Sequence, residues 1–146
     1  MERFERLNNH FYSLNLHTEK TDIKPEHNIL CFFIVEHPCS EEFIKEQALQ
    51  LLMTPCRKFD FYGAYSQKWE NGFDDVDIML HPGEEDMDIA LTSCWNDFEE
   101  FVDALHLAAF SRYFVPCDIH LIYDDEQLYN RVIARLKEYG EDVEDG

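Results

Sequence analysis

The spacing of apolar residues along the chain follows two periods, one typical of helices and the other typical of strands. Near the start, apolar residues recur at i, i+3, i+7 and i+10, and this spacing predicts one amphipathic helix; the residues are Phe4, Leu7, Phe11 and Leu14. Residues 17–28 are polar and include Pro25, so they predict a loop. The next segment, 29–35, is continuously apolar, which is typical of a central strand buried on both faces.

After this strand, the pattern predicts a helix and a second strand. Ser40 is a favourable N-cap residue, and the apolar residues of 43–52 have the spacing of one buried helical stripe. In segment 58–65, aromatic residues and Gly63 occupy alternate positions, as on one face of a strand.

The middle of the chain is less regular. Ser66 can cap a short helix, for which residues 71–72, Asn-Gly, provide a favourable end. Apolar and polar residues alternate at the end of segment 73–80, and an antiparallel edge strand fits between 78 and 91. Residues 87–93 predict a further strand.

The last third repeats the order of helix, strand and helix. Asn96 or Asp97 predicts the N-cap of a helix whose apolar stripe lies in 98–109, and residues 117–123 alternate like a strand.

A final helix follows, with Asp124 or Asp125 as its N-cap and its apolar stripe in 128–136. Gly140 is a favourable position for its end, so residues 141–146 are expected to form a frayed acidic tail.

Strands that alternate with helices favour right-handed crossovers and a parallel sheet covered on both faces. We therefore predict an α/β fold, a three-layer α/β/α sandwich with four to five mostly parallel strands, an N-terminal helix and an antiparallel edge strand. The length of 146 residues suits a single domain, 1–146, in which 1–28 form the N-terminal helix and loop. One core is expected from Phe33, Ile34, Leu51, Phe61, Leu91, Phe101, Leu105, Leu121, Val132 and Leu136.

Composition indicates a globular protein, since 45% of the residues are hydrophobic and 29% are charged. The first residues lack the basic-then-apolar order of a signal peptide, and no apolar run has a membrane span's length. A cytoplasmic location is expected. The five cysteines form no CxxC pair, which favours reduced thiols over a disulfide framework or structural zinc, and we predict no metal site.

The charge is strongly acidic, with 12 Lys and Arg against 31 Asp and Glu and a formal net charge of −19. Such a balance disfavours nucleic acid and anionic membranes as partners, because both are bound through clustered Lys and Arg. Residues 69–110 contain no Lys or Arg, so we expect a one-signed face there that attracts a basic protein. The residues expected to contact this partner are Glu84, Glu85, Asp86, Trp95, Glu99, Glu100 and Asp103.

A second set of candidates lies at the predicted carboxyl ends of the strands, where sheets of this class bind ligands. His37 follows the strand 29–35, Cys94 follows 87–93 and Asp124 follows 117–123. An imidazole beside the thiol of Cys94 or Cys39 would make a nucleophile. The turn after 29–35 contains no glycine, so a phosphate-binding loop is not predicted, and no cofactor is expected.

Segment 89–105 resembles the strand, Trp-x-Asp turn and helix of some small uncharacterised bacterial α/β domains. The matching residues are Thr92, Trp95 and Asp97, whereas Cys94 and Asn96 depart from the Thr-Trp-His-Asp form of that pattern. The resemblance implies an α/β fold and carries no activity.

Charge and size together favour a small acidic protein-binding module, of the inhibitor or immunity type, that neutralises a basic partner such as a nuclease toxin. Binding is favoured over catalysis. Two alternatives stay open: an enzyme with a strand-end pocket containing His37 and Cys94, and an accessory structural subunit, which would expose a large apolar patch.

Overall fold

Strands and helices alternate along most of this chain. The computed structural model describes residues 2–3, 10–16, 28–54, 56, 58–80, 90–110 and 117–145. Within these ranges the elements are β1 (Glu2–Arg3), β2 (His10–Asn15), β3 (Asn28–Ile34), α1 (Glu41–Leu52), β4 (Lys58–Tyr62), α2 (Ser66–Leu80), β5 (Leu91–Trp95), α3 (Phe98–Phe110), β6 (Cys117–Tyr123) and α4 (Glu126–Asp145).

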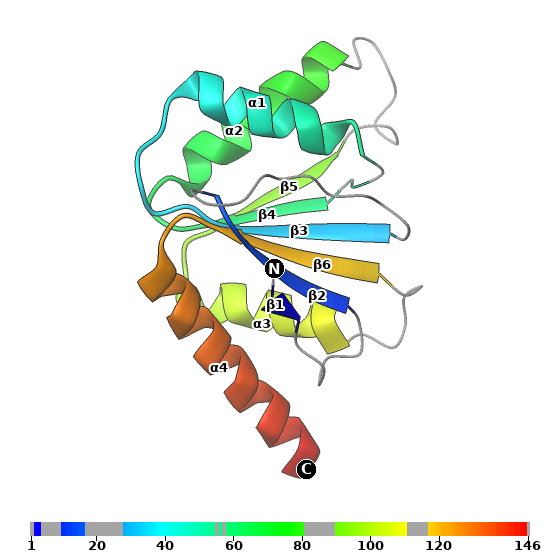
Figure 1. Cartoon of the computed structure of the whole chain (residues 1–146), viewed down its shortest axis with the longest axis vertical. Coiled ribbons are helices and arrows are strands. Elements are labelled where there is room, and N and C mark those ends of the chain that lie inside the picture. The colour runs from blue at the N-terminus through cyan, green and yellow to red at the C-terminus, as the bar shows by residue number, and fades with distance from the viewer. Residues whose placement is uncertain are drawn as a thin grey trace.

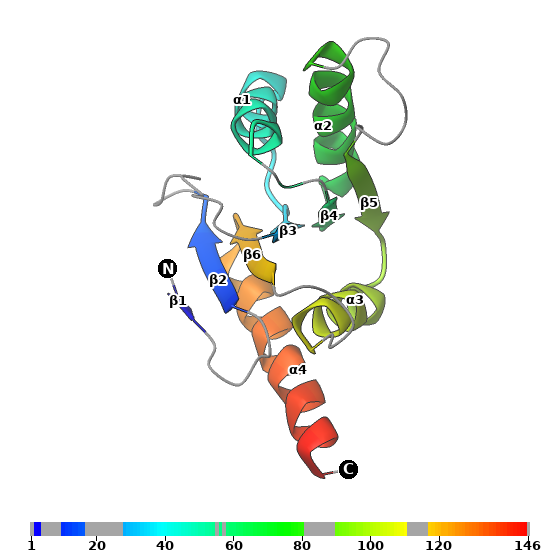
Figure 2. The same ribbon diagram turned by 90° about the vertical axis from the view of Figure 1, so that its right-hand side faces the viewer.

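The strands form one sheet in the order β1-β2-β6-β3-β4-β5. The five strands from β2 to β5 are parallel, and β1 pairs antiparallel with β2. Helices α1 and α2 cover one face, and α3 and α4 cover the other (Figure 1). A view turned by 90° shows the same three layers, with the central strands almost end-on (Figure 2). The predicted α/β/α class is confirmed, and β1 is an antiparallel edge strand. Of the edge strand predicted between 78 and 91, residues 78–80 belong to α2, and 81–89 lie outside the described residues.

The predicted N-terminal caps of three helices are confirmed. The Oγ atom of Ser40 accepts the N–H of Phe43 at 3.1 Å at the start of α1. Asp97 and Asp125 cap α3 and α4 in the same way, with carboxylate oxygens 3.0 and 2.8 Å from backbone nitrogens three residues ahead. Each cap satisfies one of the N–H groups that a helix start leaves without an intrahelical partner.

The predicted N-terminal helix is wrong over the residues described, because 10–15 form strand β2 and pair in parallel with β6. Phe4 and Leu7 lie outside the described residues. Ser13 and Leu14 are both buried, and the hydroxyl of Tyr129 in α4 donates to Ser13 Oγ at 2.7 Å. A hydrophobicity pattern counts a serine as exposed, but Ser13 is buried in this strand. The alternation of apolar and polar residues that indicates a strand is therefore hidden.

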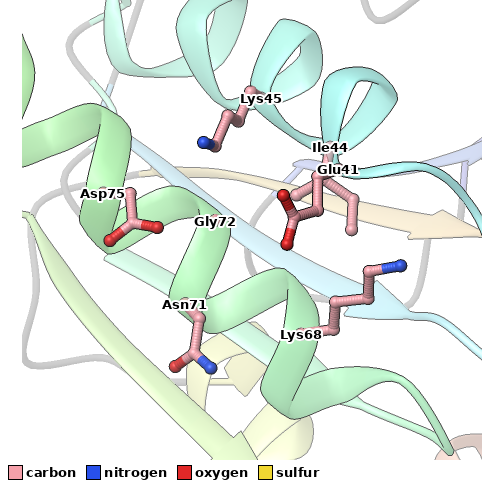
Figure 3. A pocket seen from close by; sticks show the side chains of 7 residues that line it. All are labelled: Glu41, Ile44, Lys45, Lys68, Asn71, Gly72 and Asp75. Carbon is pink, nitrogen blue, oxygen red and sulfur yellow. The ribbon is translucent and has the colours of Figure 1, made fainter.

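Helix α2 is one continuous helix, where the sequence predicted a short helix and then an edge strand. Gly72 does not end it. A Cβ atom at Gly72 would lie 2.5 Å from Cγ2 of Ile44, so this glycine lets α1 and α2 approach closely (Figure 3). The apparent alternation near its end misleads because Ile78 is 63% exposed, whereas Phe73 and Val76 are buried at helical spacing.

Three other boundaries differ from the prediction. Strand β4 ends at Tyr62, because Gly63 has a φ of +120° and a Cβ there would lie 2.6 Å from the Val35 carbonyl oxygen. Strand β5 covers 91–95, and 87–89 of the predicted strand lie outside the described residues. Helix α4 continues through Gly140 to Asp145, so the predicted helix end at Gly140 is wrong.

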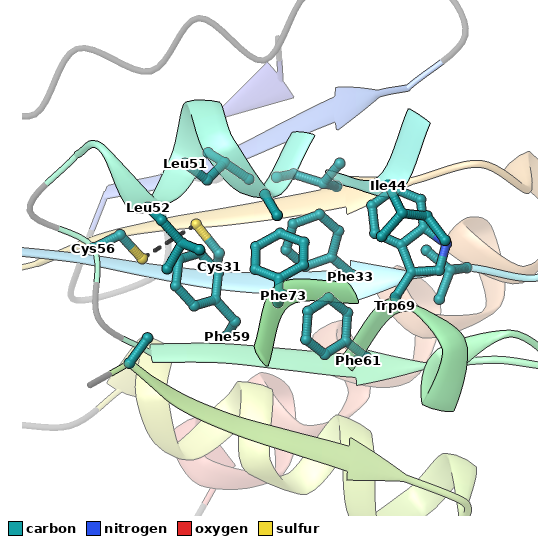
Figure 4. Packing of buried hydrophobic residues seen from close by; sticks show 14 of the residues in the cluster. Cys31, Phe33, Ile44, Leu51, Leu52, Cys56, Phe59, Phe61, Trp69 and Phe73 are labelled. Carbon is teal, nitrogen blue, oxygen red and sulfur yellow. Dashed lines mark hydrogen bonds between the residues drawn. The ribbon is translucent and has the colours of Figure 1, made fainter. Parts of the chain in front are cut away.

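The sheet divides the interior into two apolar clusters, where one core was expected. One cluster joins the sheet to α1 and α2 and contains Phe33, Leu51, Phe61 and Phe73 (Figure 4). The other, under α3 and α4, contains Phe101, Leu105, Leu121, Val132 and Leu136. All the expected core residues are buried except Leu91, which is 66% exposed at the start of the edge strand β5. Among the described residues, no helix is long and apolar enough to cross a membrane.

The burial of Leu121 gives a direct test of the second cluster. Leu121→Ala should lower the free energy of unfolding by about 2–5 kcal/mol, because it leaves a cavity beneath α3 and α4. Leu107→Ala is the control, since Leu107 is 63% exposed on α3. Urea unfolding measures both variants, and equal losses of stability would contradict this placement of Leu121.

Candidate functional site

The carboxyl ends of β3 and β6 form the position at which this class of sheet binds ligands. The two strands are neighbours, and the helices that follow them, α1 and α4, lie on opposite faces of the sheet (Figure 1). In sheets of this class, ligands bind at such a change of side. The sequence-predicted residues His37 and Asp124 both lie here.

The carboxylate of Asp124 lies at the carboxyl ends of β3 and β6. Its Oδ1 atom accepts the N–H of Glu36 at 2.8 Å, and its Oδ2 atom accepts the N–H of His37 at 3.0 Å. The side chain is almost completely buried, and the Asp124 N–H donates to the carbonyl of Ile34. Successive loop N–H groups of this kind bind anionic ligands in other sheets. Here they bind a carboxylate of the chain itself, which joins the loop after β3 to the start of α4.

His37 is turned toward α4. Its Nε2 atom lies 3.0 Å from Oδ2 of Asp125, and its side chain is 52% exposed. Asp125 also caps α4 through Oδ1. The structure therefore brings His37 together with Asp125 and, through its backbone, with Asp124.

Cys94 lies elsewhere in the sheet. It is on β5, in register with Phe61 of β4, and its thiol donates to Ser66 Oγ at 3.0 Å at the start of α2. Two strand spacings separate β5 from β3. Cys94 thus faces α2, whereas His37 contacts Asp125 beside α4, and these contacts give no support to a Cys94–His37 nucleophile.

The other candidate thiol, Cys39, is held as a weak nucleophile. Burial raises the pKa of Cys39, and this outweighs the nearby ammonium of Lys68 and the indole of Trp69, which both lower it. The carboxylate of Asp124 raises the pKa further. Since the thiolate is the reactive form, this environment disfavours covalent catalysis by Cys39.

The predicted acidic surface is described in part. Glu84, Glu85 and Asp86 lie outside the described residues. Glu99, Glu100 and Asp103 are exposed along α3. Glu99 is paired with Arg135 of α4, whose Nε lies 3.1 Å from each of its carboxylate oxygens.

The side chain of Trp95 makes contacts within the protein. Its indole N–H donates to Oδ1 of Asp60 at 3.0 Å, and its ring packs against the cluster under α3 and α4. Truncation of Trp95 would therefore change stability before it changed binding.

Several acids have structural roles that the sequence analysis missed. Asp60 is buried in β4, where Lys58 Nζ lies 3.1 Å from Oδ1 and also 3.1 Å from Ser93 Oγ. Asp77 is buried and accepts the N–H of Ala90 at 2.8 Å, and Asp74 accepts the hydroxyl of Thr92 at 2.9 Å. For Asp60, the signal was a charged residue between two core phenylalanines; Asp74 and Asp77 carried no such signal.

A groove with charged walls lies between α1 and α2 (Figure 3). It encloses about 80 Å³ and is lined by Glu41, Ile44, Lys45, Lys68, Asn71, Gly72 and Asp75. Pockets for small molecules typically enclose about 300–1,000 Å³. The groove is too small to indicate a ligand site, and within the described part of the chain no three His, Cys, Asp or Glu side chains are placed to hold a metal ion.

Comparison of the chain with protein-family models, curated proteins and solved structures finds no match. The resemblance of segment 89–105 therefore stays a prediction.

The role of Asp124 as a loop clamp can be tested by removing one of its two acceptor oxygens. Asp124→Asn leaves one loop N–H facing an amide NH₂, so the free energy of unfolding should fall by about 1–3 kcal/mol. Asp103→Asn on the exposed face of α3 is the matched control and should change it by less than about 0.5 kcal/mol. Equal effects in chemical denaturation would contradict the clamp.

Proposed function

We propose that this chain is a small acidic protein-binding module that neutralises a basic protein partner, in the manner of an inhibitor or immunity protein. One observation carries the proposal: residues 69–110 contain no Lys or Arg, and α3, which lies inside this stretch, has acidic side chains on its exposed face.

The acidic face of α3 consists of Glu99, Glu100, Asp103 and Leu107. Glu99, Asp103 and Leu107 are spaced by four residues, and Glu100 lies beside them, so the four side chains share one side of the helix. All four are exposed. A surface with carboxylates around a solvent-exposed leucine suits a partner that offers Lys or Arg around an apolar contact.

Most carboxylates of this face would attract a basic partner at long range. Arg135 of α4 pairs with Glu99, whereas Glu100 and Asp103 are exposed to solvent. With a net charge of −19 behind them, these carboxylates would accelerate encounter with a basic protein and orient it toward α3.

The test begins with a partner captured on the immobilised chain at low salt, released by added salt and then purified. Its association and dissociation rates are measured with the wild-type chain. The on-rate should fall steeply as salt is added, because the Debye length shortens, while the off-rate changes less. An acidic partner, or an on-rate independent of salt, would contradict the proposal.

A charge-matched pair of variants locates the surface. The double variant Glu100→Gln with Asp103→Asn should slow association several-fold at low salt and weaken its salt dependence. Glu42→Gln with Glu46→Gln removes the same charge from the exposed side of α1, on the other face of the sheet, and should slow association less. Equal effects of the two double variants would place the contact away from α3.

A further inference from the structure

Two cysteine side chains meet inside the cluster beneath α1 and α2. Cys31 lies in β3, and Cys56 lies between α1 and β4. Their sulfur atoms are 3.4 Å apart, and both residues are fully buried (Figure 4). The two residues are 25 positions apart in the chain, so the fold, and not local sequence, brings them together.

The contact is specific to this pair among the thiols that the structure describes. Cys94 donates to Ser66 Oγ at 3.0 Å. Cys39 is half-buried, and its carbonyl oxygen accepts a hydrogen bond from Lys68 Nζ at 2.6 Å. Among these four described thiols, oxidation directed by the fold therefore has one favoured product.

We propose that Cys31 and Cys56 are an oxidative modification site, and that they join in an intramolecular disulfide when the chain folds in the presence of a small disulfide such as oxidised glutathione. One thiolate attacks the glutathione disulfide and releases one glutathione. The second thiolate then attacks the mixed disulfide and releases the other. Two protein thiols lose two electrons and two protons, and one glutathione disulfide is reduced to two glutathione molecules.

The geometry requires a small movement. Bonded sulfurs lie about 2.05 Å apart, so the pair must close by about 1.4 Å. Cys31 is fixed by pairing of β3 with both β4 and β6. Cys56 lies outside the strands, with its N–H bonded to Thr54 Oγ1 at 3.2 Å, so the approach falls mainly on Cys56.

Burial determines when the reaction occurs. It raises the pKa of Cys31 well above its ordinary value, and the neighbouring Cys56 raises it further. The folded chain thus holds a protonated thiol that the oxidant does not reach. The first exchange takes place in the open chain or during local opening, and folding then favours the second.

Thermodynamic linkage makes it possible to measure how strongly the native fold favours the disulfide. If the native fold holds the thiols in contact, it raises their effective concentration over that in the unfolded chain, and the disulfide stabilises the native fold by the same factor. We expect a factor on the order of 100 or more. That factor corresponds to about 2.8 kcal/mol at about 1.4 kcal/mol per tenfold.

The experiment refolds the reduced full-length chain in glutathione buffers of graded ratio, and then blocks the remaining thiols and maps disulfides by mass spectrometry of non-reduced digests. The Cys31–Cys56 linked peptide should dominate. Its equilibrium with glutathione should favour the disulfide on the order of 100-fold more in native buffer than in urea. A mixture of pairings, or equal equilibria in the two solvents, would overturn the proposal.

Alanine variants separate this pair from the other thiols. Cys31→Ala and Cys56→Ala should each abolish the linked peptide, whereas Cys39→Ala and Cys94→Ala should retain it. If either core variant fails to fold, the mapping of the wild-type chain and its urea comparison still decide the matter. The oxidised wild-type chain should also unfold at a higher urea concentration than the reduced chain, and an unchanged midpoint would count against the site.

Discussion

The rest of the structure depends on strand β3, which is hydrogen-bonded on both edges and covered on both faces. It pairs with β4 over residues 30–34 and with β6 over 28–34. Its side chains alternate between the two apolar clusters, with Phe33 beneath α1 and α2 and Ile34 on the side of α3 and α4. A strand in this position has no solvent-exposed face. Each face of the sheet must therefore be covered by amphipathic helices. That requirement explains why helices are needed on both sides of the sheet.

Acidic residues in this chain serve two separate purposes. Asp60, Asp77 and Asp124 are buried, and each accepts a hydrogen bond from a donor in another part of the fold. These hydrogen bonds offset part of the cost of burying a carboxylate, which is high for a group without partners. Glu100 and Asp103 are exposed on α3 instead. Net charge alone does not distinguish these two groups, and only exposed carboxylates would contribute to the proposed surface for a basic partner.

The fold class was predictable because β3 is a continuous apolar run, β6 alternates, and α1 and α3 each have an apolar stripe and a side-chain cap. The pattern failed where a tertiary contact determines a residue's environment. Ser13 is buried in β2 through its bond with Tyr129 of α4, and Gly72 continues α2 because α1 packs against it. For the candidate site, the sequence placed His37 and Asp124 correctly beyond the strand ends. It did not predict that Asp124 would accept the loop's N–H groups, because these contacts join positions of the chain that are separated by 88 and 87 residues.

The sheet also separates the two proposed activities of the molecule. The Cys31–Cys56 contact lies in the cluster beneath α1 and α2, whereas the acidic face of α3 rests on the other cluster. Helices α1 and α3 lie on opposite faces of the sheet (Figure 1). A disulfide between Cys31 and Cys56 would join β3 to the connection before β4 without a contact to α3. Oxidation would therefore raise the stability of the fold and leave the charges that a basic partner meets in place, so that partner affinity and resistance to unfolding are set by different faces of the same sheet.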